Sequence, residues 1–300
     1  MRLSLAIKQF TEWRALKVGQ NTNQGYELVL KQFCLFMKNC EIEDVQLSHI
    51  VEWFSMMQEL GWDSNSFVIK STALRKFFEF NKKQGFEVLD PWFIFTPKAK
   101  FKIPRIITEE NYQKLLSAIP DNNDPRHIRN KAIISLLWDT GARNGEIVSL
   151  DIQGLDLVNF KALIYTEKSK GARPVREMFW TEETNKNLLR WIDRREHLSQ
   201  KMKWIDPEAL FVCVSFHAGE RLTIKGVGEM LRRYSNQAGI ETMNAHSFRH
   251  HLGREIIKRG GTNADVMNVL GHATLESTKP YTWLENKEIE KRYRSLKLST

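Results

Sequence analysis

The chain has 300 residues, of which 42% are hydrophobic and 27% are charged. This composition predicts two globular domains with sizeable cores and excludes a disordered or fibrous protein. The formal net charge of +9 at pH 7 favours a polyanionic partner, nucleic acid before membrane, although the same excess could serve solubility alone.

Cysteine usage and hydropathy indicate the compartment. The three cysteines, Cys34, Cys40 and Cys213, form no CxxC pair, so we expect neither disulfides nor a cysteine-based zinc site. The apolar runs fall far short of the roughly 20 residues that a membrane span needs. Charged residues interrupt the apolar N-terminal stretch, unlike in a signal peptide. The sequence therefore predicts a soluble, cytoplasmic protein.

Residues 1–90 are expected to form a small helical domain. Apolar residues recur at helical spacing in four stretches, residues 5–16, 26–37, 50–60 and 67–80. Thr22 or Asn23 could cap the second helix, after a break over residues 19–23. Aromatic side chains in this region could stack on bases, but their helical spacing favours the core. They include Trp13, Trp53, Phe54, Phe77 and Phe78.

Residues 91–105 are expected to link this domain to the next. The stretch has no helical period and is rich in proline and basic residues. The basic residues are Lys98, Lys100, Lys102 and Arg105. A basic, extended strap suits a phosphate backbone, so we expect these residues to bind DNA; a merely solvated linker is the alternative.

Residues 106–300 are expected to form a mainly helical second domain with a small antiparallel sheet, an α+β arrangement. Thr108, followed by two glutamates, predicts a helix start. Strands are expected over residues 161–166 and 174–180, joined by a turn, with a further candidate strand over residues 210–214. Helices are expected over residues 129–140, 182–198, 224–238, 245–259 and 264–270.

The sequence contains no Walker loop, GxGxxG, HExxH or GxSxG motif. The candidate groups are instead cations, histidines and one late tyrosine. Arg143 lies between Gly141 and Glu146, which predicts a helix break with the arginine pointing outward; its planar donors can hold two phosphate oxygens. Lys168, at the tip of the turn between the strands, could donate a proton. Taken alone, the first could be a helix cap paired with Glu146 and the second a solvated turn.

His246 and Arg249 stand three positions apart and therefore share one face of a helix. An imidazole beside a guanidinium suits a phosphate that gains charge in its transition state. Gly271 is expected to end a helix, which puts His272 at a turn, and Tyr281 follows nine residues later. A tyrosine becomes a nucleophile only near a strong positive field. Taken alone, this tyrosine would belong to the core or to an interface.

In this order the groups resemble the tyrosine recombinase (phage-integrase) family, in particular its Xer-like site-specific recombinases, over nearly the whole chain. Residues 140–146 (TGARNGE) match the pattern TGLRxxE, residues 246–250 (HSFRH) match HxLRH, and residues 270–281 match LGHxxxxxTxxY. The resemblance implies a core-binding domain in residues 1–90 and a catalytic domain in residues 106–300. It also implies a two-domain, C-shaped clamp around duplex DNA.

The resemblance implies the chemistry as well. Tyr281 would attack a scissile DNA phosphate, forming a 3′-phosphotyrosyl link and freeing a 5′-hydroxyl. Arg143 and Arg249 would hold the non-bridging oxygens and offset the growing charge. His246 would assist proton transfer at the tyrosine, and His272 would hydrogen-bond the phosphate.

The turn between the strands completes the expected site. Lys168 would protonate the leaving 5′-oxygen and is preferred over Lys170, because it lies five residues before Arg173, as in the family. Lys170 and Arg173 are expected to bind DNA. The resemblance implies no cofactor and no metal; the spacing of His246 and His250 permits zinc, but we do not expect it.

Four questions stay open at this point. Pro280 departs from the family pattern, so the tyrosine could act within its own chain or in a partner. We expect a tetramer on paired DNA sites, and residues 285–298 could pack on a neighbouring copy or on their own domain. A DNA-relaxing enzyme of type IB and a catalytically silent DNA-binding protein are the alternatives. Chromosome dimer resolution and the integration or excision of a mobile element are equally compatible roles.

Overall fold

The computed structural model describes residues 1–18, 20–98, 104–165, 175–201, 204–215, 217–271 and 294. The chain divides into two compact units, Met1–Lys102 (unit 1) and Ile103–Thr300 (unit 2), and each is described by itself. Among the helices of the described residues, none has the length and apolar content of a membrane span.

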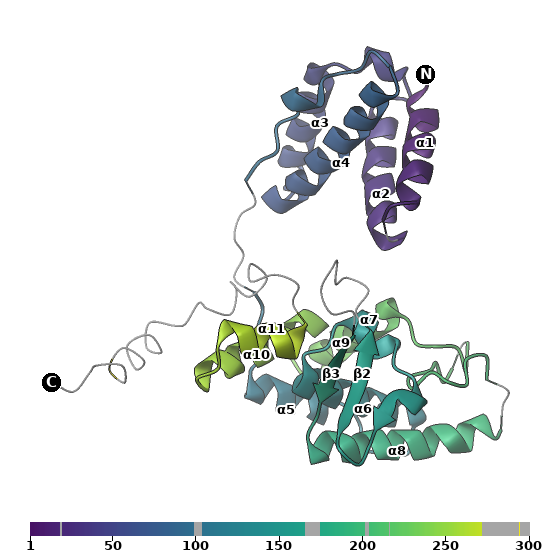
Figure 1. The fold of residues 1–300 in the computed structure, drawn as a ribbon, viewed down its shortest axis with the longest axis vertical. Helices are drawn as coiled ribbons and strands as arrows, with labels where there is room; N and C mark the ends of the chain where they lie inside the picture. The colour runs from purple at the N-terminus through teal and green to yellow at the C-terminus, as the bar shows by residue number, and fades with distance from the viewer. Residues whose placement is uncertain are drawn as a thin grey trace. The chain divides into compact units, whose positions relative to one another are not determined.

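Unit 1 consists of helices, as predicted (Figure 1). They are α1 (Leu3–Ala15), α2 (Gln20–Phe36), α3 (Leu47–Glu59) and α4 (Ser64–Lys83), with short 3-10 helices η1 (Ile42–Asp44) and η2 (Pro91–Phe93). The predicted cap of α2 is wrong, because the helix begins at Gln20, before Thr22 and Asn23. The Asn23 side chain instead donates to the carbonyl of Thr11 at 2.9 Å, which joins α2 to α1.

The core of unit 1 is rich in aromatic side chains. The prediction that Trp53, Phe77 and Phe78 are core residues is confirmed, since each is at most 2% exposed. Phe54 is half-buried, with its ring centroid 5.6 Å from that of Trp53. Trp13 lies at the margin, 40% exposed, and packs one face against Phe80.

In unit 2, α6 packs on α8 and α10. The helices described in this unit are α5 (Glu109–Ser117), α6 (Pro125–Thr140), α7 (Asn144–Val148), α8 (Glu182–Ser199), α9 (Ile224–Gln237), α10 (Ala245–Lys258) and α11 (Asn263–Leu270). The predicted helices are confirmed, and α5 begins after Thr108 as expected. α6 begins four residues earlier than predicted, because Asp124 caps it and Pro125 supplies a backbone already suited to the first turn.

The sheet of unit 2 has three antiparallel strands in the order β1-β2-β3 among the described residues. The predicted strands correspond to β2 (Lys161–Tyr165) and β3 (Val175–Phe179), with Leu163 opposite Glu177; the two-residue β1 (Leu155–Asp156) had no sequence signal. The architecture predicted for unit 2, mainly helical with a small antiparallel sheet, is confirmed.

The strand predicted over residues 210–214 is wrong. This largely buried segment makes one isolated bridge among the described residues, Val212 to Arg221. Side chains take up two of its carbonyls: Trp191 donates to that of Leu210 at 2.8 Å, and Arg129 donates to that of Val212 at 2.7 Å. The segment thus has the burial and the apolar character of a strand, but it does not form the ladder of backbone hydrogen bonds that a strand makes with its neighbour.

Candidate active site

The site is built around the turn after α6. Gly141 ends that helix with φ at +55°, in the left-handed region that favours glycine. A Cβ atom there would lie 3.2 Å from the Cα atom of Arg249 and 3.0 Å from a methyl group of Leu270. The glycine thus permits both the backbone turn and the close approach of α10 and α11.

Arg143 follows this turn and occupies the N-cap position of α7. Its backbone N–H donates to Oε2 of Glu146 at 2.9 Å, and its Nη1 donates to Oε1 at 2.7 Å. Glu146 therefore fixes both the backbone and the guanidinium of Arg143. The side chain of Arg143 is 24% exposed, so the guanidinium is held in place and still reaches solvent.

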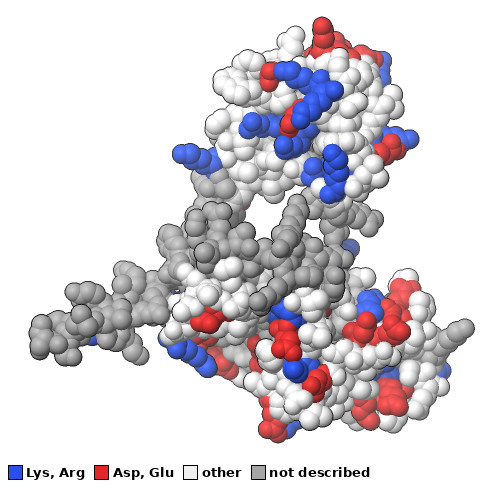
Figure 2. Space-filling model, viewed as in Figure 1, with Lys and Arg blue, Asp and Glu red and all other residues white. Residues whose placement is uncertain are grey.

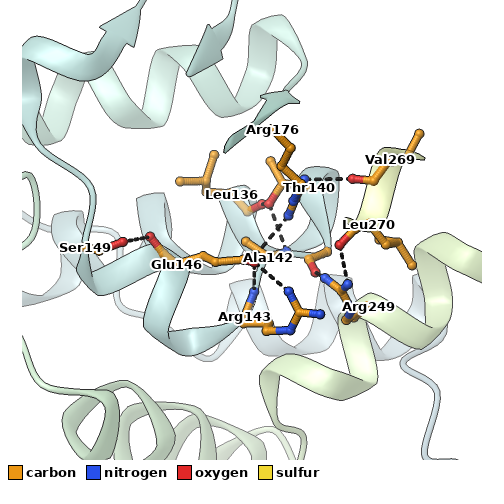
Figure 3. A network of polar contacts seen from close by, with 11 residues as sticks. Leu136, Thr140, Ala142, Arg143, Glu146, Ser149, Arg176, Arg249, Val269 and Leu270 are labelled. Carbon is orange, nitrogen blue, oxygen red and sulfur yellow. Dashed lines mark hydrogen bonds and ion pairs between the residues drawn. The ribbon is translucent and has the colours of Figure 1, made fainter. Parts of the chain in front are cut away.

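Arg249 reaches the same turn from α10 and is 2% exposed. Its Nη1 donates to the carbonyl of Gly141 at 3.0 Å, and its Nη2 donates to the carbonyl of Leu270 at the end of α11 (Figure 3). One guanidinium on α10 thus joins the end of α11 to the turn after α6, which lies 108 positions away in the sequence. The structure brings together the two arginines that the sequence predicted to act on one phosphate.

A third arginine, Arg176 on β3, belongs to this cluster and was missed by the sequence analysis. Its Nη2 donates to Oε2 of Glu146 at 3.0 Å, and its Nη1 donates to the carbonyl of Val269 at 2.7 Å (Figure 3). A signal existed, since strand alternation puts residue 176 on the same face as the buried Met178. A charged residue on the inner face of a strand needs a partner.

The cluster holds a buried carboxylate in its ionised form. Burial by itself would raise the pKa of Glu146, but the positive charges of Arg176, Arg143 and Arg249 and the Arg143 N–H bring that pKa below its usual value. Burial also lowers the pKa of Arg176, against the opposing effect of Glu146. Among the described residues, three guanidiniums surround this carboxylate, so the positive charge of the cluster exceeds its negative charge and suits a phosphate.

The predicted histidine His246 lies exposed on α10, one turn before His250. Their ring centroids are 6.4 Å apart. Burial, with smaller contributions from His246 and Arg249, lowers the pKa of His250 to about 4, so this imidazole is neutral at pH 7. His251 stacks on Trp138, with ring centroids 4.1 Å apart. In the part of the chain that the structure describes, no three potential metal ligands are grouped.

Several predicted residues lie outside the described residues. They are Lys100, Lys102, Lys168, Lys170, Arg173, His272, Tyr281 and the tail over residues 285–298 except position 294. Of the predicted DNA-binding residues in the linker, Lys98 is exposed. Arg105 pairs with Glu241 at 2.5 Å. Gly271, which ends α11 with φ at +64°, is the residue immediately before His272.

Comparisons with known proteins agree with this geometry. Residues 105–288 match the phage integrase family model. The chain is 24% identical over 291 residues to the tyrosine recombinase XerC of Corynebacterium glutamicum, covering 96% of this chain and 90% of that protein. It is 27% identical to the tyrosine recombinase XerD of Oceanobacillus iheyensis, covering 98% of each.

Solved structures share the fold. The XerH site-specific recombinase bound to a difH substrate in a pre-cleavage complex superimposes with a TM-score of 0.74, at 20% identity and with 99% of this chain and 96% of that chain covered. The Tn1549 transposon integrase in complex with transposon right-end DNA gives a TM-score of 0.73, also at 20% identity, with 99% and 100% covered.

The family match spans well over half of the chain and includes the whole arginine cluster. The resemblance found in the sequence motifs is therefore confirmed. This chain belongs to the phage integrase family, the family of the tyrosine recombinases.

Proposed function

We propose that the chain is a site-specific DNA recombinase that cleaves and rejoins DNA strands through a 3′-phosphotyrosyl intermediate. The observation that carries this proposal is the meeting of Arg143 and Arg249 at the turn after α6, with Glu146 fixing the first of them. Family membership supports the reaction class.

The arginines supply the electrostatic part of this mechanism. A phosphodiester under attack passes through a five-coordinate state in which charge grows on the non-bridging oxygens. Guanidinium groups whose positions are already fixed stabilise that charge without reorganising during the reaction. Arg143 is held by Glu146, and Arg249 is held by the carbonyls of Gly141 and Leu270.

The bond-making residues are assigned from the motif alone. The phenol oxygen of Tyr281 attacks phosphorus, the bond to the 5′-oxygen breaks, and Lys168 supplies the proton that the leaving oxygen takes up. His246 assists proton transfer at the tyrosine, and His272 binds the phosphate. The phosphotyrosyl ester conserves the bond energy, so the free 5′-hydroxyl of a partner strand attacks it to rejoin the DNA.

The proposed partner is duplex DNA carrying paired recombination sites, bound by four copies of the chain. Two neighbours in fold were solved with DNA, the XerH recombinase with difH and the Tn1549 integrase with a transposon end. Figure 2 shows lysine and arginine side chains on the face of unit 1 where α4 lies. The exposed cations of that helix are Arg75, Lys76, Lys82 and Lys83. The clamp around DNA, and the choice between chromosome resolution and element mobility, stay predictions.

The test uses nicked suicide duplexes drawn from DNA flanking the gene and from the replication terminus. We expect the full chain to form an SDS-resistant adduct with one strand, and Tyr281→Phe to form none. Tyr293→Phe is the matched control, because it removes another C-terminal tyrosine hydroxyl outside the family motif. An adduct that persists in Tyr281→Phe would overturn the assignment of the nucleophile.

Two other outcomes separate the alternatives. Relaxation of supercoiled plasmid without recombination between paired sites would indicate a type IB-like relaxing enzyme. Tight binding to a DNA site with no adduct on that site in any nicked form would indicate a DNA-binding protein without the chemistry.

A further inference from the structure

The geometry points to Arg176 as a positioning residue of the phosphate site, a role that rests on the proposed function. We propose that Arg176 neutralises Glu146, so that Arg143 keeps its charge for the scissile phosphate. Arg176 also fixes the end of α11 through the carbonyl of Val269, immediately before the segment that carries His272.

The first part of the proposal concerns charge. Oε1 of Glu146 accepts from the Arg143 guanidinium, while Oε2 accepts from the Arg143 backbone and from Arg176. A buried carboxylate next to a phosphate site repels the substrate and cancels the charge of the nearest cation. With Arg176 in place, Glu146 still orients Arg143, but its negative charge is balanced from the other side.

The second part concerns the end of α11. Two arginines on different elements hold two successive carbonyls there: Arg176 from β3 holds that of Val269, and Arg249 from α10 holds that of Leu270. The side-chain stem of Arg176 lies against Gly271, where a Cβ atom would come within 2.6 Å of its Cδ. Arg176 therefore helps to fix the end of α11 up to Gly271, the residue that precedes His272 in the sequence.

Arg176 lies on β3, eight residues after Lys168 in the sequence. Its side chain joins β3 to α7 through Glu146 and to the end of α11 through the carbonyl of Val269. A buried ion pair is weak evidence for a purely stabilising role, because desolvation of the two charges offsets their attraction. Its place between these three segments favours a role in the site.

The first experiment measures anion binding by the full chain without DNA. The melting temperature is followed as inorganic phosphate replaces chloride at constant ionic strength. The part of the temperature shift that Arg143→Met loses is assigned to phosphate bound at this site. We expect a saturable rise for the wild type and about tenfold weaker phosphate binding for Arg176→Met. Arg195→Met is the matched control: Arg195 is also buried and donates to two carbonyls, those of Ala209 and Pro207.

The second experiment measures single-turnover adduct formation at saturating nicked DNA. We expect Arg176→Met to cleave about 10- to 100-fold more slowly, with DNA affinity within about twofold of the wild type, because small displacements of reacting groups are costly. Arg176→Lys should restore phosphate binding but not the cleavage rate, since one ammonium group cannot reproduce the planar fork that reaches both Glu146 and Val269. A merely structural arginine would not separate the two measurements in this way.

The outcomes are distinct. Arg176→Met that behaves as Arg195→Met in both experiments would overturn the proposal. If phosphate does not specifically raise the melting temperature of the wild type, the proposal that Arg176 neutralises Glu146 is overturned. If Arg176→Lys cleaves as fast as the wild type, the proposal that Arg176 fixes the end of α11 is overturned. Absence of an adduct from the wild type on every DNA would count against the proposed function, while the phosphate titration would still decide whether Arg176 supports an anion site.

Discussion

The two units differ in where their positively charged side chains lie. Unit 1 keeps its cations at the surface and fills its core with apolar and aromatic side chains; Lys70 is its one buried charged residue among those described. Unit 2 buries Arg129, Arg195 and Arg249 together with Glu146. Removing a guanidinium from water is costly unless its donors are satisfied. The buried arginines of unit 2 therefore indicate that their hydrogen bonds hold separate segments of this unit together.

These buried arginines perform two separate tasks. Arg129 and Arg195 donate to carbonyls of the segment over residues 207–212, which lies outside the helices and strands. Burial lowers the pKa of Arg129 to about 10, which leaves it charged at pH 7. Arg249 and Arg176 instead tie together the segments of the candidate site. Each buried arginine in this unit therefore holds separate segments together, and only those at the candidate site are expected to affect the reaction.

The distinction between these two tasks is tested by comparing Arg249→Met with Arg195→Met. Both should destabilise unit 2 by about 2 to 4 kcal/mol, because each removes a buried guanidinium that donates to two carbonyls. Only Arg249→Met should also lower the single-turnover cleavage rate, by about 10³-fold, since it removes a charge from the transition state. Urea unfolding and adduct formation measure the two effects. Equal cleavage by the two folded variants would contradict the assignment.

The core of unit 1 is tested by Phe77→Ala. Phe77 is fully buried, with ring centroids 5.7 Å from Phe10 and 5.3 Å from Phe78. Its truncation should cost about 3 to 5 kcal/mol through the cavity it leaves. Hydrogen exchange, followed peptide by peptide in the full chain, should show lost protection in unit 1 and unchanged protection around α6. Lost protection in both would mean that the units do not unfold separately.

Glu146→Gln tests the buried carboxylate of unit 2 and should cost about 2 kcal/mol at pH 7. The amide removes the negative charge that pairs with Arg143 and Arg176, and its NH2 group cannot accept the hydrogen bonds that one carboxylate oxygen accepts. The folded protein lowers the pKa of Glu146, so its contribution is complete above the unfolded value of about 4.3 and is lost as the pH falls through the folded value. The stability difference between wild type and variant should therefore shrink below about pH 4 in urea titrations. A difference that stays constant down to pH 3 would show that charge is not involved.

Most helices of both units could be predicted because each buries one face at a regular spacing. The errors share a physical cause, which is that the deciding contact comes from elsewhere in the chain. Asn23 lies inside α2, where its side chain bonds to Thr11 on α1. Residues 210–214 form one isolated bridge, and side chains from α6 and α8 take up the carbonyls of Val212 and Leu210. Local motifs predicted Arg143 and Arg249, whereas the partners of Arg176, Glu146 and Val269, are 30 and 93 positions away.

The smallest expected effect belongs to Lys70→Met, which tests the buried cation of unit 1. Lys70 donates to Gln32 at 2.6 Å, and its ammonium lies 4.4 Å from the ring centroid of Trp62. Burial lowers the pKa of Lys70, so the folded protein disfavours its charged form, and this penalty is relieved as the pH rises through the folded pKa. Replacement by an apolar side chain of similar length should therefore change stability by less than about 1 kcal/mol at pH 7. Between pH 7 and 10 the free energy of unfolding of the wild type should rise relative to that of Lys70→Met. If the variant instead loses several kcal/mol of stability at pH 7, the hydrogen bond of Lys70 holds unit 1 together as those of the buried arginines hold unit 2.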